Sequence, residues 1–239
     1  DLQGSGNEPG LSDATGNMAL IGDFKKIWDF WAPRYDRLLT QRFVMIPTNE
    51  TVCAHLKEKA PPPESILDIG CGTGRLALQL AALFPGAGIT GADYCRKMIE
   101  MAEQKNHFPR LTFIHGSLEQ LPPGKRYDVI VSTHSFPYFA DKAKTAGTFF
   151  RLLKPGGRVI IVQGNNNNAY DALWLFFVHL TVSRGKFLSV GKVNELLLQA
   201  GFSPGRVRRI KPTFWMPSVY MVEGLRNQEQ IKCDQIQDP

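Results

Sequence analysis

One stretch decides the fold of this chain: DIGCGTG at residues 68–74. It closes a short apolar run, residues 65–69, and precedes an amphipathic run, residues 75–84. This order predicts a strand, a glycine-rich turn and a helix. Glycines in such a turn permit positive φ and a close approach of a ligand to the backbone, and the first turn of the helix offers unpaired N–H groups. The stretch therefore predicts a ligand-binding loop at the carboxyl end of a strand.

The pattern of apolar runs continues outward from this stretch. Further strands are predicted at residues 88–92, 111–115, 127–132 and 158–163. Helices are predicted at residues 96–104, 142–153, 172–182 and 191–200, and two closing strands at residues 207–210 and 219–223. Short apolar strands that alternate with helices are typical of a parallel sheet with helices on both faces. The predicted fold class is therefore α/β, doubly wound.

Length and composition predict one large folded domain. The chain has 239 residues, of which 43% are hydrophobic and 21% charged, close to ordinary globular usage. Its longest strongly apolar run, residues 172–182, is too short for a membrane-spanning helix of about 20 residues. We predict a flexible leader at residues 1–17, the domain at 18–225 and a polar tail at 226–239. Within the domain we predict an N-terminal helical cover at 18–60, with a helix at 23–40, and a lid insertion at 164–190.

The net charge and the cysteine spacing limit the kinds of partner, the metal sites and the compartment that we predict for the chain. The net charge of +6 leaves nucleic acid open. The basic residues are scattered except for one cluster, which predicts a solvated edge or an anion-facing rim rather than a nucleic-acid surface: Arg206, Arg208, Arg209 and Lys211. The four cysteines show no CxxC spacing, and no Asp, His or Cys cluster has the spacing of metal ligands. We therefore predict no metal, no disulfide framework and a reducing, cytoplasmic compartment.

Two cofactor classes fit the spacing of the glycines. Gly72, Gly74 and Ala77 satisfy the spacing G-x-G-x-x-A of dinucleotide sites, and Asp93 lies about 20 residues on, where a ribose-binding acid is expected. A nicotinamide cofactor and S-adenosylmethionine both pass this test. Asp68 favours the second, because a carboxylate at this place repels a pyrophosphate. It suits the cationic amino group and sulfonium of S-adenosylmethionine, which has no phosphate.

Both acids also have structural alternatives. Asp68 could cap the helix at Thr73, and Asp93 could cap the next helix. As a ligand-binding group, Asp93 would accept hydrogen bonds from both hydroxyls of an adenosine ribose. Tyr94 and Met98 would flank the adenine ring or belong to the core.

Together these stretches resemble the class I S-adenosylmethionine-dependent methyltransferases. DIGCGTG is similar to the family's glycine-rich motif, and DYCRKMI at residues 93–99 to its acidic loop, with Cys95 where serine is commoner. LKPGGR at residues 153–158 resembles the turn before its fifth strand, and residues 196–202 the helix and turn near its C-terminus. APRYDR at residues 32–37 is similar to the start of quinone-biosynthesis methyltransferases. The resemblance spans about residues 24–224.

The resemblance implies a mostly parallel, seven-stranded sheet with an antiparallel last strand and the cofactor across the carboxyl ends of the first strands. The cofactor contacts that the resemblance implies are Gly70, Cys71, Gly72, Gly74, Asp93, Ser117 and Leu118. The predicted cofactor site also includes Asp68, Tyr94, Met98, Tyr35 and Thr133. Ser117 departs from the family pattern, in which Asp commonly accepts from the adenine amino group. A serine hydroxyl accepts more weakly, whereas the backbone N–H of Leu118 remains available.

The segment after the fourth strand supplies the candidate catalytic residue. SFPY at residues 135–138 superficially resembles the N-P-P-Y motif of amino-group methyltransferases, but it lacks the first amide or acid and the first proline. His134 is the better candidate, because an imidazole beside the transferred methyl could take a proton from the acceptor. The alternative is that His134 only packs on the cofactor. His115 and His179 are expected to be structural.

Aromatic residues in the predicted cover and lid favour an apolar acceptor, although ordinary core packing is the alternative: Trp28, Trp31, Tyr35, Trp174, Phe176, Phe177, Phe214 and Trp215. The predicted function is methyl transfer from S-adenosylmethionine to a small lipophilic or aromatic acceptor. A nucleic-acid methyltransferase, an NAD(P)-dependent oxidoreductase and an inactive cofactor-binding subunit are the alternatives. The oligomeric state and the methylated atom are not predicted.

Overall fold

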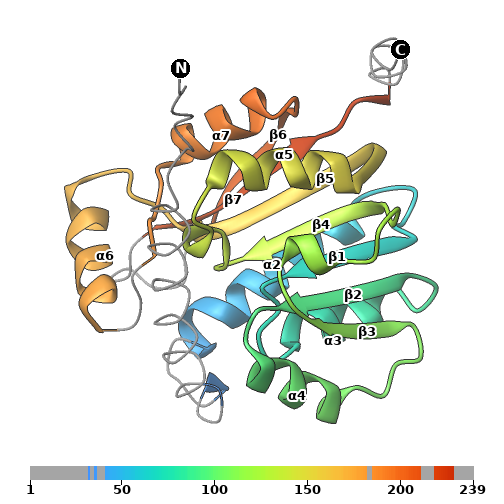
Figure 1. Ribbon diagram of the computed structural model, residues 1–239. Coiled ribbons are helices and arrows are strands. Elements are labelled where there is room, and N and C mark those ends of the chain that lie inside the picture. The colour runs from blue at the N-terminus through green and yellow to red at the C-terminus, as the bar shows by residue number, and fades with distance from the viewer. Residues whose placement is uncertain (1–31, 33–34, 37–40, 182–184, 211–217, 229–239) are drawn as a thin grey trace, which may run out of the picture.

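The computed structural model describes residues 32, 35–36, 41–181, 185–210 and 218–228 (Figure 1). Its centre is a seven-stranded sheet in the order β3-β2-β1-β4-β5-β7-β6. The strands are β1 (Ser65–Ile69), β2 (Gly88–Asp93), β3 (Leu111–His115), β4 (Tyr127–Thr133), β5 (Leu153–Gly164), β6 (Ser203–Ile210) and β7 (Val219–Leu225). All are parallel except β7, which lies antiparallel between β5 and β6. The doubly wound, mostly parallel sheet with an antiparallel last strand is confirmed.

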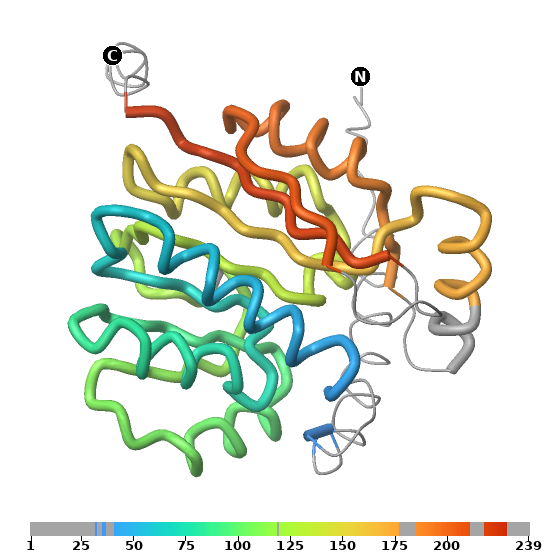
Figure 2. The backbone as a smooth tube through the Cα atoms, turned by 180° about the vertical axis from the view of Figure 1, so that it is seen from behind, coloured from blue at the N-terminus to red at the C-terminus, as the bar shows by residue number. Residues whose placement is uncertain are grey.

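Helices cover both faces of the sheet. One face packs against α2 (Ile46–Lys57), α3 (Arg75–Leu83) and α4 (Arg96–Lys105), and the other against α5 (Lys142–Leu152) and α7 (Val190–Gln199). Figure 1 shows α5 in front of the sheet, and Figure 2, seen from behind, shows α2 and α3 in front of it. The remaining helical segments are η1 (Gln41–Met45), η2 (Leu118–Gln120), η3 (Phe136–Tyr138) and α6 (Ala169–Thr181).

Burial on both faces explains the unbroken apolar runs of the central strands. On β1, Ile66 packs with the cluster under α2 and α3, whereas its neighbour Leu67 packs with the cluster under α5 and α7. On β5, Ile160 and Ile161 divide between the same two clusters. Strands with two buried faces need apolar residues at successive positions, so they show no alternation with polar residues.

Several predicted bounds are corrected by the structure. The predicted helix at 142–153 ends at Leu152, because Leu153 is already extended and pairs with Tyr127 of β4. The helix predicted from residue 172 begins at Ala169, where the Asn168 side chain accepts a hydrogen bond from the N–H of Asp171 at 2.9 Å. The predicted cover contains a separate helix, α2, which the sequence pattern did not distinguish. The predicted helix at 23–40 lies outside the described residues apart from residues 32, 35 and 36.

Helix α6 stands apart from the sheet in both views (Figures 1 and 2). Its sequence is AYDALWLFFVHLT, and among the side chains of residues 169–176 the large exposed apolar ones are those of Tyr170, Leu173 and Phe176. Among the helices that the structure describes, none combines the length and the apolar character needed to cross a bilayer.

Candidate functional site

The glycine-rich loop after β1 lies at the carboxyl ends of β1 and β2. Its first N–H groups, of Gly70 and Cys71, donate to the carbonyl of Ala92 at 2.7 and 3.1 Å. Gly70 has a φ of +72°, and a Cβ at this position would lie 2.2 Å from the Cβ of Ser135. Gly74 has a φ of +78° at the start of α3, where a Cβ would lie 2.6 Å from the Phe113 ring. Both the backbone conformation and the space therefore require glycine at these two positions.

Ser135 holds the loop after β4 against the end of β1. Its hydroxyl donates to the carbonyl of Ile69 at 2.7 Å and lies 2.7 Å from the hydroxyl of Ser132. In the sequence, residues 135–138 stand out only for a poor motif match, which does not predict this bracing role. A hydroxyl next to a glycine with no room for a side chain gives no sequence pattern of its own.

Asp68 is the least satisfied polar group of the site. Its side chain is 0% exposed, and within the described chain neither carboxylate oxygen has a hydrogen-bond partner. Burial, followed by the charge of Asp93, raises the pKa of Asp68 to about 7. The backbone N–H of Ala77 opposes this rise without reaching the geometry of a hydrogen bond. The alternative of a helix cap at Thr73 is therefore wrong, and a buried acid without a hydrogen-bond partner suits a cationic group.

Asp93 joins the end of β2 to the glycine-rich loop. Its Oδ2 accepts from the N–H of Gly72 and its Oδ1 from the N–H of Cys95, both at 2.8 Å. Burial raises the pKa of Asp93 although these two N–H groups act against it. Cys95 is the residue before α4, so Asp93 also acts in part as a cap of α4 by accepting from the N–H of Cys95. Each oxygen keeps a second lone pair, so the bonds leave it able to accept from a ligand hydroxyl.

Cys71 is a thiol rather than a nucleophile. Burial, together with the carboxylates of Asp93 and Asp68, raises its pKa well above the ordinary value. A cysteine that reacts as a nucleophile needs the opposite environment, one that favours the thiolate. Cys71 therefore lacks the environment of a reactive cysteine.

Tyr35 and Asp36 bring the N-terminal segment onto the glycine-rich loop. Asp36 accepts from the hydroxyl of Thr73 at 2.7 Å and from Lys105 at 2.5 Å. Burial would raise the pKa of Asp36, but these hydrogen bonds outweigh burial and lower it. A Cβ on Gly72 would lie 3.8 Å from the Tyr35 ring. Tyr35 was expected at the site, whereas Asp36 was missed, although it belongs to the motif APRYDR.

The predicted adenine contacts come from two places: Ser117 and Leu118 lie in the loop after β3, and Tyr94 and Met98 follow β2. The loop after β3 reaches the site, since the N–H of Gly116 donates to the carbonyl of Asp93 at 2.9 Å and leads directly to Ser117 and Leu118. The N–H of Ser117 is bonded to the side chain of Gln120 at 2.9 Å.

Tyr94 and Met98 lie in different surroundings. The side chain of Tyr94 is 44% exposed and so remains open to a ligand. Met98 is 2% exposed and packs with Ala32 and Cys95. Its position in this small cluster corresponds to the core alternative.

His134 follows β4 in a strained backbone conformation. Its φ is +56°, the one positive value at a non-glycine position in the part of the chain that the structure describes. Its N–H donates to the carbonyl of Val162 at 2.6 Å, and its Nε2 lies 3.0 Å from the hydroxyl of Thr48. Burial lowers the pKa of His134 to about 4, so the imidazole is neutral at pH 7. Thr133 is the last residue of β4 and pairs with Val162.

Buried polar side chains fasten the start of the predicted lid to β7. Asp171 of α6 is 1% exposed and accepts from both the hydroxyl and the N–H of Ser218, at 2.5 and 2.9 Å. Asn165 is 0% exposed, donates its N–H to the carbonyl of Ser218 at 2.9 Å, and accepts from the N–H of Tyr220 at 3.1 Å. Sequence analysis did not single out either anchor.

The aromatic residues of the predicted acceptor side are only partly described. On α6, the ring of Trp174 lies 6.5 Å from that of Tyr170, centre to centre. Five other predicted positions lie outside the described residues or have undescribed side chains: Trp28, Trp31, Phe177, Phe214 and Trp215. The side chain of His179, which was expected to be structural, is also undescribed.

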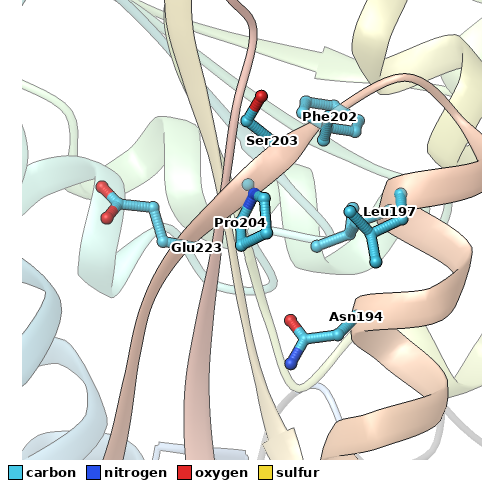
Figure 3. Close-up of a pocket in the computed structure, with 8 residues that line it drawn as sticks. Asn194, Leu197, Phe202, Ser203, Pro204 and Glu223 are labelled. Atoms are coloured by element: carbon cyan, nitrogen blue, oxygen red, sulfur yellow. The ribbon is translucent and has the colours of Figure 1, made fainter.

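A separate pocket of about 180 Å³ lies between α7 and the strands β6 and β7 (Figure 3). Pro204 and Gly224, which line it, pair with each other, and Gly224 pairs with Val159 in the middle of β5, away from the carboxyl end of that strand at Gly164. This places the pocket away from the glycine-rich loop. In Figure 3 the carboxylate of Glu223 points away from Leu197, toward the far side of the strand. The pocket therefore lacks converging polar groups and is not the candidate site.

The basic cluster lies on the edge strand β6. The N–H of Arg206 donates to buried Glu223 at 3.1 Å, and its guanidinium pairs with Glu58 at 2.9 Å. Arg208 and Arg209 are exposed, while Lys211 lies outside the described residues. Arg206 is thus paired rather than part of an open anion-facing rim. Across the described ranges, no group of three His, Cys, Asp or Glu side chains could hold a metal ion.

Comparison with known proteins gives one family and several relatives. The family described as a methyltransferase domain matches residues 66–157. The chain is 30% identical over 164 residues to the demethylmenaquinone methyltransferase of Deinococcus radiodurans. The matched region covers 66% of this chain and 68% of that protein. It is 34% identical over 123 residues to the malonyl-[acyl-carrier protein] O-methyltransferase of Priestia megaterium, which covers 52% of this chain and 44% of that protein. The chain thus spans about half the length of this second relative.

A solved structure extends the likeness to most of the chain. Magnesium protoporphyrin IX methyltransferase from Synechocystis PCC 6803, crystallised with SAH, superposes with a TM-score of 0.68 and 20% identity. The superposition covers 84% of this chain and 98% of that structure. At this identity the likeness establishes the fold.

Proposed function

Because this chain belongs to the class I S-adenosylmethionine-dependent methyltransferases, we propose that it transfers a methyl group from S-adenosylmethionine to a small, lipophilic or aromatic acceptor. The observation that carries the proposal is Asp68, a fully buried carboxylate without a hydrogen-bond partner in the described chain. A buried acid of this kind is stabilised by a cation and opposes a diphosphate. This favours S-adenosylmethionine over a nicotinamide dinucleotide.

The described residues fit this cofactor. The loop at Gly70 and Gly74 has no room for side chains, which fixes its backbone beside Asp93. Asp93 retains acceptor capacity for ribose hydroxyls beside its two backbone bonds. Asp68 would hold the amino group, and the loop at Ser117 and Leu118 the adenine. When bound, S-adenosylmethionine supplies a methyl group on a positively charged sulfur that is a good leaving group.

The main contribution of the protein to the reaction is then to place the acceptor and the cofactor relative to each other. In-line alignment of acceptor, methyl and sulfur supplies much of the rate, and a base is needed only for an acceptor that still carries its proton. S-adenosylmethionine held in this way would supply the methyl carbon for the new bond to the acceptor atom, and the electron pair of the broken bond would stay on sulfur. We propose that His134, neutral and at the end of β4, faces the acceptor.

Two observations support a lipophilic acceptor. Helix α6 follows the carboxyl end of β5 and carries Tyr170, Trp174 and Phe176. The name of the Deinococcus relative makes demethylmenaquinone its acceptor. A lipophilic ring of that kind would suit aromatic side chains.

Calorimetry with the whole chain tests the cofactor. S-adenosylhomocysteine should bind, NAD should not, and Asp68→Asn should weaken the binding of S-adenosylhomocysteine. Tight NAD binding without a response to S-adenosylhomocysteine would overturn the proposal. A screen of quinols, phenols and malonyl thioesters with labelled S-adenosylmethionine then identifies the acceptor. Salt-sensitive gel shifts with RNA or DNA, followed by methylation of the nucleic acid, would instead support the nucleic-acid alternative.

A further inference from the structure

The N-terminal cover supplies a hydroxyl to the imidazole at the site. Thr48 of α2 is 0% exposed, and its Oγ1 lies 3.0 Å from Nε2 of His134, 86 residues away in sequence. Within the described chain, no other residue hydrogen-bonds this hydroxyl or either ring nitrogen of His134. Within the described chain, each of these two side chains therefore has only the other as its hydrogen-bond partner.

Burial decides the direction of this hydrogen bond. If Nε2 carried the proton and donated it, the Thr48 O–H would be left as a buried donor without an acceptor in the described chain. An unpaired buried donor is unfavourable, and buried donors are rarely left unpaired. If the Thr48 hydroxyl donates to Nε2, its proton is paired, and only the lone pairs of its oxygen remain without a hydrogen-bond donor. Thr51, one turn further on, shows the usual alternative for a helical hydroxyl, since it donates to the carbonyl of Pro47 at 2.7 Å.

We propose that Thr48 is a positioning residue, whose hydroxyl donates to Nε2 of His134 and fixes the imidazole in the tautomer that carries its proton on Nδ1. The ring then presents an N–H donor to the acceptor instead of a lone pair. Nδ1 has no partner in the described chain and is not among its fully buried unsatisfied atoms, so this nitrogen retains access to open space. The bond from the His134 N–H to Val162 holds the backbone in place behind the ring.

This tautomer narrows the acceptor class, a step that rests on the proposed function. A neutral Nδ1–H donor cannot take the acceptor's proton at Nδ1. It stabilises an oxygen that accepts a hydrogen bond, such as a phenolate, a carboxylate or a ring carbonyl beside the methylated atom. The acceptor therefore carries such an oxygen and loses any proton before the methyl group is transferred.

The test is a long-range ¹H–¹⁵N correlation spectrum of the whole chain with ¹⁵N-labelled histidine, at pH 7. The signals of His134 are assigned by their loss in His134→Asn. The expected wild-type spectrum shows His134 protonated at Nδ1. Thr48→Val, which keeps the branched shape, should abolish that pattern, and Thr48→Ser should restore it. Thr51→Val is the matched control on the same helix and should leave the pattern unchanged.

A wild-type spectrum with His134 protonated at Nε2 would overturn the proposal, and so would an Nδ1–H pattern that survives in folded Thr48→Val. If Thr48→Val does not fold, the wild-type spectrum and Thr48→Ser still decide. The outcome is separable from that of the proposed function, because binding of S-adenosylhomocysteine is measured independently. Once an acceptor is found, Thr48→Val should lower kcat about tenfold with little change in cofactor affinity, as expected for the loss of one hydrogen bond.

Discussion

The glycine-rich loop and helix α6 follow strands at the same end of the sheet, but they are held in different ways. The loop and Asp93 come from one continuous segment, residues 68–93, and backbone N–H groups join its two ends, as in the bond from Gly72 to Asp93. Helix α6 is held by side chains from distant parts of the chain, since Asp171 binds Ser218, 47 residues away. The proposed cofactor side therefore depends on local geometry, and the proposed acceptor side on tertiary packing.

This difference predicts how each side responds to mutation. A loop defined by positive φ and close backbone contacts tolerates almost no added atom, so its changes should be large and confined to cofactor binding and stability. A helix fastened at one end and exposed along another face tolerates many changes. Its substitutions should act mainly on the acceptor.

The largest effect is expected for Gly70→Ala. The added Cβ would lie 2.2 Å from the Cβ of Ser135 at a φ of +72°. Strain of about 1–2 kcal/mol and overpacking of about 1–3 kcal/mol should together lower the free energy of unfolding by about 3 kcal/mol. Urea denaturation measures the loss, and calorimetry should show no binding of S-adenosylhomocysteine.

Gly86→Ala is the control for this change, because a Cβ there meets nothing within 4 Å. Its free energy of unfolding should stay within about 0.5 kcal/mol of the wild type. The double variant Gly70→Ala with Ser135→Gly should recover part of the stability, because it removes the clash but not the strained φ. A Gly70→Ala protein with normal stability and binding would contradict the claim that the loop is fixed by close contacts.

The same difference explains what the sequence could predict. Gly70, Asp68 and Asp93 occur within one strand-turn-helix-strand pattern, so spacing alone brings them to one end of the sheet, as the structure shows. Asp36 and Thr48 were not foreseen, because they meet Lys105 and His134 only after the chain has folded. No local period or motif spacing encodes a contact between residues 86 positions apart.

The next effect in size is that of Asp93→Ala on cofactor affinity. The change removes the acceptor for a ribose and leaves the N–H groups of Gly72 and Cys95 without their partner. Binding of S-adenosylhomocysteine should weaken by about 1.5–3 kcal/mol, the usual value for hydrogen bonds to a charged group. Asp141→Ala removes a purely helix-capping acid at α5 and should leave affinity unchanged. Equal, small effects of the two variants on calorimetry would show that Asp93 is only a cap.

A smaller effect is expected from the pH dependence of cofactor binding. Burial, followed by the charge of Asp93, raises the pKa of Asp68 to about 7 in the free protein. An ammonium group beside Asp68 requires the ionised carboxylate, so affinity should rise as pH rises through 7. Between pH 6 and pH 8 the ionised fraction increases about tenfold, so the association constant for S-adenosylhomocysteine should increase about tenfold. Calorimetry across this range should show the rise in the wild type and a flat profile in Asp68→Asn, and a wild-type affinity that falls with pH would refute the contact.

Trp174→Ala should have the smallest effect on cofactor binding, because Trp174 lies on α6 and not in the glycine-rich loop. Trp174 lies on α6 with its ring 6.5 Å from that of Tyr170, and none of the described hydrogen bonds ties it to the glycine-rich loop. The dissociation constant of S-adenosylhomocysteine should therefore stay within about twofold of the wild type. The Michaelis constant for an acceptor identified by the screen should rise several-fold, because about 1 kcal/mol of aromatic contact is lost. Leu173→Ala, which shortens a side chain that is 55% exposed on the same helix, controls for general loosening of α6. If Trp174→Ala weakened cofactor binding as much as acceptor binding, the change on α6 would have altered the glycine-rich loop as well. The helix and the loop would then form one coupled site, although distant contacts hold the helix and local backbone bonds hold the loop.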